Sequence, residues 1–122
     1  MLIKEERMKF FLSKKKLISQ FAQELAFLQI RADWWHYIST EPTHLDSVAN
    51  RLDQISELRF LCQELNILSE VYEEAYKIYD FRDSGKSYFN CDKELVIKLN
   101  KEFCKPIMDR RYGKPEGENN EY

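Results

Sequence analysis

The sequence predicts an all-α protein, built as a long antiparallel helical hairpin with a shorter third helix and a C-terminal tail. Residues 1–84 contain no glycine and a single proline, Pro42, and these two residue types are the strongest helix breakers. On either side of Pro42, apolar residues recur at helical spacing over a long segment. The 122 residues suffice for one domain that buries its own core.

The first helix is expected to run from Lys4 to Ile38. Its core stripe follows steps of three and four residues through Phe11, Ile18, Phe21, Leu25, Leu28, Ala32 and Trp35. Ser13 could be a cap that divides the segment, but the three lysines after it would oppose the helix dipole in a first turn. We therefore expect a continuous helix, roughly 50 Å long, whereas a compact domain of this size is about 35 Å across.

The second half of this helix carries a further apolar stripe, formed by Phe27, Ile30, Trp34 and Tyr37. A short third helix could not cover both this stripe and a second apolar face on the following helix. Because a helix that is apolar on two sides must be covered on both, we expect a partner here. That partner is either another protein or a second copy of the chain, and a homodimer is plausible.

The turn is expected at residues 39–43, since Pro42 disfavours helical geometry in the residue before it. The second helix should then continue to Tyr79. One of its faces carries Val48, Leu52, Ile55, Cys62, Leu65, Leu68, Tyr72, Ala75 and Tyr79. A second face is apolar through Phe60, Ile67 and Val71.

Three tyrosines lie near the end of this second helix: Tyr72, Tyr76 and Tyr79. They follow the spacing i, i+4, i+7 and therefore share one side of the helix. Tyrosine is enriched at protein interfaces, so these residues are candidates for protein binding. The alternative is that they pack at the edge of the core beneath the first helix.

The third helix should begin near Asp92, after a loop over residues 80–91, and Pro106 should end or kink it. Its inward residues are expected to be Leu95, Val96, Leu99 and Phe103. The segment from Arg110 onward holds two of the three glycines and no aliphatic residue. We therefore expect a single domain over residues 1–109 and a flexible tail over residues 110–122.

The net charge of −2 hides a gradient along the chain. Residues 1–20 carry six basic and two acidic side chains, whereas residues 41–80 carry three basic and nine acidic ones. In a long hairpin, residues 1–20 would lie beside residues 61–80, and the opposite charges would neutralise each other. A strongly basic face of the kind that binds nucleic acid is therefore not expected.

Several functional classes are disfavoured by what the sequence contains. The first residues include acidic side chains and no apolar run of secretory type, and no segment reaches 18 consecutive apolar residues. We expect a cytoplasmic protein without a membrane partner, whose cysteines Cys62, Cys91 and Cys104 are reduced thiols. The only two histidines, His36 and His44, are too few for a typical transition-metal site. Neither a cofactor nor a small-molecule substrate is indicated.

One short motif points to catalysis. Arg31 and His36 are separated by four residues, and this Arg-x4-His spacing resembles the motif of HEPN-type ribonucleases, which are small all-helical domains that commonly act as dimers. The resemblance covers six residues. It implies that His36 would act in acid–base chemistry and that Arg31 would hold the scissile phosphate. The alternative is a set of solvated polar groups beside two packing tryptophans.

On balance the sequence favours a non-enzymatic protein-interaction module, such as an adaptor, an inhibitor or an assembly subunit, that acts through an aromatic-rich helical surface. Two alternatives stay open. One is a HEPN-like ribonuclease using Arg31 and His36. The other is a nucleic-acid-binding accessory protein, and its candidate residues are Lys14, Lys15, Lys16, Arg110 and Arg111.

Overall fold

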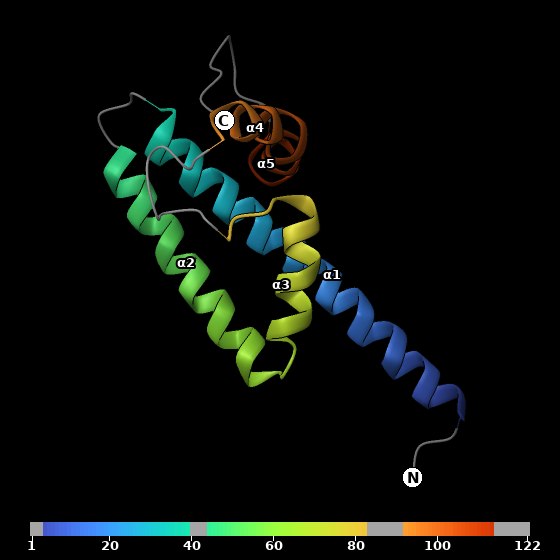
Figure 1. Cartoon of the computed structure of the whole chain (residues 1–122). Helices are drawn as coiled ribbons and strands as arrows, with labels where there is room; N and C mark the ends of the chain where they lie inside the picture. Colours follow the sequence, from blue (N-terminus) through green and yellow to red (C-terminus); the bar gives the residue numbers. More distant parts are fainter. Residues whose placement is uncertain (1–3, 40–43, 83–91, 114–122) are drawn as a thin grey trace.

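The computed structural model describes the backbone of residues 4–39, 44–82 and 92–113, and the side chains of residues 13–39, 47–82 and 92–113. These residues form helices and turns without a strand, which confirms the all-α class (Figure 1). The helices are α1 (Lys4–Tyr37), α2 (His44–Glu64), α3 (Leu68–Ile78), α4 (Lys93–Leu99) and α5 (Lys105–Tyr112), with a π-helical turn, Asn100–Cys104, between the last two. Residues 40–43, where the first turn was expected, lie outside the described part.

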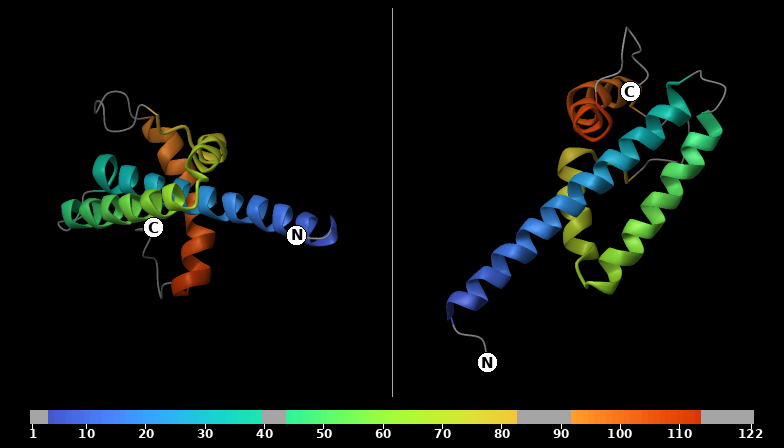
Figure 2. Two further views of the ribbon diagram at one scale, coloured as in Figure 1. Left: turned by 90° about the horizontal axis from the view of Figure 1, so that it is seen from below. Right: turned by 180° about the vertical axis from the view of Figure 1, so that it is seen from behind.

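Helix α1 passes Ser13 without a break, so its predicted continuity is confirmed. At 34 residues it is about 50 Å long, and its N-terminal half projects beyond the other helices (Figures 1 and 2). The other elements gather around its C-terminal half. The helix therefore overhangs the rest of the described structure, as follows from a helix longer than the diameter of a compact domain of this size.

The second helix differs from the prediction because it is interrupted near its middle. Helix α2 ends at Glu64, and Asn66 adopts a left-handed conformation with φ 58°. The Ile67 N–H donates to the Cys62 carbonyl oxygen at 3.0 Å, and the Asn66 N–H donates to the Gln63 carbonyl oxygen at 3.1 Å. These two bonds form a Schellman motif, and asparagine tolerates the left-handed geometry that such a motif requires.

Because of this break, the long hairpin is replaced by three helices that meet at angles. Helices α2 and α3 both pack on α1, whereas they touch each other mainly near the turn that joins them (Figure 1). The break also redistributes the predicted core face. Leu52 and Leu65, which were expected inside, are 49% and 46% exposed.

The core lies around the C-terminal half of α1, where residues 25–34 are enclosed on nearly every side. All four residues from Leu25 to Leu28 are buried, and so are all five residues from Ile30 to Trp34. A helix with such runs must have neighbours all round. The other helices contribute Ile55, Cys62, Val71, Ala75, Val96, Cys104, Ile107 and Met108.

The last helical unit crosses α1 steeply (Figure 2) and begins where it was predicted. The Asp92 side chain caps α4 by accepting a hydrogen bond from the Leu95 N–H at 3.1 Å. Pro106 does not end the unit, because the π-helical turn before it bonds the Lys105 N–H to the Asn100 carbonyl oxygen. Proline lacks an N–H and displaces the preceding turn, and the wider turn accommodates that loss.

The predicted tail boundary is too early, because α5 extends through Arg110 to Tyr112. Gly113 follows with a positive φ of 78°, as is usual for a glycine that ends a helix. The rest of the expected tail, residues 114–122, lies outside the described residues.

The turn between α2 and α3 can be tested at Asn66. An alanine there must adopt the left-handed conformation, at a cost of about 1 kcal/mol, whereas glycine adopts it without strain. We expect Asn66→Ala to lower the free energy of unfolding in urea and Asn66→Gly to leave it nearly unchanged. Equal stability of the two variants would contradict a left-handed residue at this position.

Candidate functional site

The first feature of interest is a buried arginine in the centre of the fold. Arg31 is 1% exposed, and its Nη1 donates to the Asn100 side-chain oxygen at 2.6 Å. The guanidinium carbon also lies 4.8 Å from the ring centroid of Trp34 and 5.5 Å from that of Trp35. A guanidinium stacked on aromatic rings and hydrogen-bonded to an amide is stabilised despite its burial. These contacts join α1 to the π-helical turn.

The second feature is the buried carboxylate of Asp33, two residues after Arg31 in α1. Asp33 is 4% exposed. Its Oδ2 accepts a hydrogen bond from the Tyr79 hydroxyl at 2.5 Å, and its Oδ1 accepts one from the Gln29 side-chain amide at 3.1 Å. Bonds to an ionised acceptor are among the stronger ones in proteins. This carboxylate therefore holds the segment that follows α3 against α1.

The structure does not bring the predicted ribonuclease pair together. Arg31 is enclosed by the core, whereas His36 is exposed and lies in a pocket of about 270 Å³ between α1 and α2 that Arg31 does not line. Residues five positions apart on a helix point in directions that differ by about 140°. A buried guanidinium cannot hold a phosphate ester in solvent, so the geometry removes the basis for this reading.

The stripe predicted to bind a partner is mostly core. Phe27, Ile30 and Trp34 are 0%, 0% and 8% exposed, and only Tyr37 is half-buried. Phe27 illustrates how they are covered, because the guanidinium of Arg51 in α2 and that of Arg111 in α5 both lie over its ring. The stripe is therefore covered largely within the chain, where α2, α3, α4 and the π-helical turn all contact α1.

The three tyrosines proposed for binding have different environments: Tyr72 and Tyr76 lie in α3, and Tyr79 is the residue after it. Tyr79 is buried on Asp33, as described above, whereas Tyr72 and Tyr76 are half-buried. All three rings lie around Phe81, with centroids 6.1, 4.8 and 6.1 Å away for Tyr72, Tyr76 and Tyr79. Burial raises the pKa of the Tyr72 hydroxyl, while the nearby Arg59 opposes that rise. Tyr79 therefore packs in the core, as the alternative interpretation expected, whereas Tyr72 and Tyr76 remain partly accessible to solvent.

Neither of the two described thiols has the character of a nucleophile. Cys62 and Cys104 are buried and form no disulfide. Burial raises the pKa of the Cys104 thiol from 9.0 to about 12, even though Arg31 and Arg51 both act to lower it. A thiol that stays protonated at neutral pH is inert. Cys91 lies outside the described residues.

An exposed apolar surface lies at the end of α2. Phe60, Leu61 and Leu65 are 65%, 44% and 46% exposed, and we call these three residues the α2 patch. Sequence analysis placed Phe60 on a face that needed cover and Leu65 in the core, but it did not identify the patch. The available signal was the presence of apolar residues on more sides of α2 than one packing face can bury.

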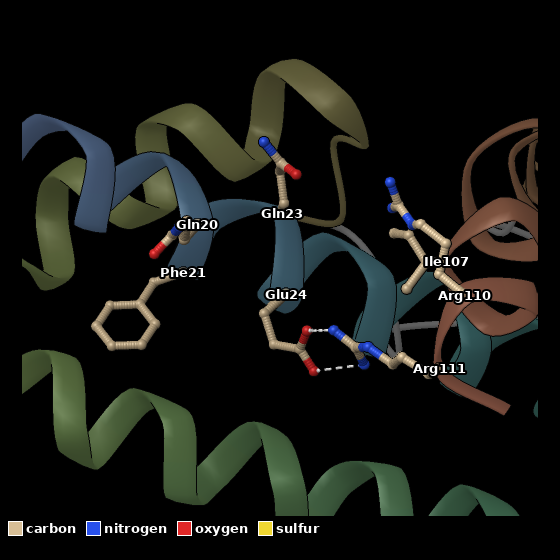
Figure 3. A pocket seen from close by; sticks show the side chains of 7 residues that line it. All are labelled: Gln20, Phe21, Gln23, Glu24, Ile107, Arg110 and Arg111. Atoms are coloured by element: carbon tan, nitrogen blue, oxygen red, sulfur yellow. Dashed lines mark hydrogen bonds and ion pairs between the residues drawn. The ribbon is translucent and has the colours of Figure 1, made fainter.

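The cations proposed for nucleic-acid binding do not form one basic face. Arg111 is paired with the Glu24 carboxylate, which also raises the pKa of its guanidinium. The pair lines a groove of about 360 Å³ between α1 and α5, and Arg110 lines the same groove with its side chain directed away from the pair (Figure 3). A carboxylate inside the groove would repel a phosphate. Lys14, Lys15 and Lys16 are exposed nearer the N-terminus of α1.

The hydrogen bond between Arg31 and Asn100 predicts a stability effect. Asn100→Ala removes an acceptor from a buried charged donor and should lower the free energy of unfolding by about 2 kcal/mol. Lys101→Ala, at the exposed neighbouring position, is the matched control and should change little. Equal effects of the two substitutions in urea titrations would contradict a structural role for the bond.

The raised pKa of Cys104 predicts a loss of stability at alkaline pH. The native state keeps the thiol protonated up to about pH 12, whereas the unfolded chain releases its proton near its ordinary pKa. Unfolding should therefore become easier above about pH 9, by about 1 kcal/mol per pH unit. The Cys104→Val variant should lack this part of the slope in urea titrations, and an unchanged slope would contradict the assignment.

The described residues contain no group of three or more histidine, cysteine, aspartate or glutamate side chains placed to hold a metal ion. Within the same part of the chain, no helix is long and apolar enough to cross a membrane. Comparison of the chain with protein-family models, with curated protein sequences and with solved structures gives no match.

Proposed function

We propose that the protein is a non-enzymatic protein-interaction module, such as an adaptor, an inhibitor or an assembly subunit, and that it binds its partner through the α2 patch. The observation that carries the proposal is the exposure of Phe60, which is 65% exposed beside two further apolar residues. Burying a phenylalanine or leucine side chain contributes about 1.5–3 kcal/mol. Three such side chains on one short segment supply a substantial part of a binding energy.

The surroundings of the patch support the same function. Glu57, Gln63 and Glu64 are exposed on the same part of α2, so polar side chains accompany the apolar ones. Protein interfaces combine apolar and polar residues in this way. The half-buried rings of Tyr72 and Tyr76 belong to the same proposed surface, because Arg59 of α2 lies over the Tyr72 ring at 5.8 Å.

The proposal also fits the structural role of the polar residues that are buried in the core. Arg31 and Asp33 could serve in a reaction, but both are buried and hold other helices in place. The buried free thiols Cys62 and Cys104 suit a reducing compartment, and we place the protein in the cytoplasm on that ground. No cofactor and no small-molecule substrate is required.

The test is capture of partners by the tagged protein from a nuclease-treated lysate of the native host, compared between wild type and Phe60→Asp. We expect Phe60→Asp to lose a stoichiometric partner and to weaken its binding by about 2 kcal/mol, which is about thirtyfold in Kd. Ile97→Asp is the matched control, since Ile97 is 49% exposed on α4. Circular dichroism should show that both variants remain folded.

Identical partners for wild type and Phe60→Asp would contradict the proposed surface. Loss of the partner in Ile97→Asp as well would show that the effect is not specific to α2. Recovery of nucleic acid alone from a parallel untreated lysate, lost on nuclease treatment, would overturn the function itself.

A further inference from the structure

We infer that the partner of the α2 patch is a second copy of this chain, whose overhanging half of α1 lies across the patch. By two-fold symmetry the same contact is made twice, once by each chain. The inference rests on the proposed function and names the partner that it requires. It combines three observations, namely unmatched positive charge on α1, unmatched negative charge on α2, and the overhang itself.

The positive charge lies where α1 leaves the rest of the protein. Lys14, Lys15 and Lys16 are all exposed. Three consecutive helical residues cover more than half of the circumference at 100° per residue. No ion pair among the described residues involves any of them. This part of α1 therefore presents a positive surface in several directions.

The negative charge borders the α2 patch. Glu57 and Glu64 are exposed on α2, and the ion pairs of the described residues include neither of them. Sequence analysis expected Glu64, within residues 61–80, to lie beside residues 1–20 of the same molecule and to be neutralised there. The structure does not form those pairs in its described part, because the N-terminal half of α1 projects past the other helices (Figure 1).

One chain thus carries two surfaces of opposite charge that do not neutralise each other. When one molecule carries two complementary surfaces, two copies related by a two-fold axis can bring them together, and each contact then occurs twice. Charge complementarity also steers encounter and selects the register of the partners. A second copy satisfies both requirements without any further protein.

The overhang adds a reason for the contact. Most helical stability in proteins comes from packing of an apolar face on neighbours rather than from helix propensity, and the N-terminal half of α1 projects beyond the other helices (Figure 1). Leu17 and Ile18 follow the lysines directly and are half-buried, so apolar area remains beside the charges. Packing of this area on the α2 patch would stabilise the helix and cover Phe60, Leu61 and Leu65 together.

The test is the mass of the protein in solution, measured by sedimentation over a range of concentrations. We expect wild type to form a dimer of two 14.8 kDa chains. The variant K14E/K15E/K16E and the variant E57K/E64K should each raise the dimer Kd about tenfold or more, because like charges then face each other. An equimolar mixture of the two variants should restore a dimer containing one chain of each.

The matched control is K98E/K101E/K105E, which changes the net charge by the same amount at three exposed lysines of the last helical unit. It should dimerise like wild type. Dimerisation should also weaken as salt is added, since screening shortens the range of charge interactions from about 30 Å at 0.01 M to about 8 Å at 0.15 M.

A wild-type protein that stays monomeric at about 0.1 mM, above the Kd range of specific interfaces, would overturn the inference. The proposed function would survive that result if Phe60→Asp still lost a host partner. A dimer that neither charge variant weakens, or a mixture that fails to restore it, would also overturn the inference. So would a monomer whose three lysines instead bind RNA.

Discussion

The burial of residues 25–34 of α1 on nearly all sides is the constraint on which the rest of the structure depends. No single neighbour can cover a helical segment that is buried around its circumference, so α2, α3 and the α4–α5 unit each pack on a different part of it. Two charged residues, Arg31 and Asp33, lie within this enclosed region. Their burial is tolerated only with polar partners, and Asn100 and Tyr79 supply them from two different elements.

These two contacts show that Arg31 and Asp33 act as structural links between α1 and other elements. Arg31 is hydrogen-bonded to Asn100 and stacked on two tryptophans, and it thereby holds the last helical unit against α1. The nearby Cys104 thiol remains protonated because desolvation outweighs the attraction of two guanidinium groups. A hydrogen-bonded buried polar pair leaves few alternative arrangements, which suits a role in selecting one packing of the helices.

The same constraint determines what remains on the surface. Since the other helices cover most of the second stripe of α1, the aromatic residues Phe27 and Trp34, which sequence analysis assigned to binding, lie inside the protein. Helix α2 then buries only one side, and Phe60, Leu61 and Leu65 stay exposed. The overhanging half of α1 keeps its lysines in solvent. Both halves of the proposed contact are thus consequences of how the core is filled.

The sequence by itself determined the features that depend on local interactions. Helical periodicity predicted the class, the lysines after Ser13 predicted the continuity of α1, and the change of pattern near Asp92 predicted the start of α4, because these signals act within a few residues. Asn66 carried a local signal for the break, but asparagine also occurs within helices. Only the tertiary structure decided whether Phe27 and Trp34 were core or interface. The bonds from Arg31 to Asn100 and from Asp33 to Tyr79 span 69 and 46 residues, and such distant pairs leave no trace in the spacing of one sequence.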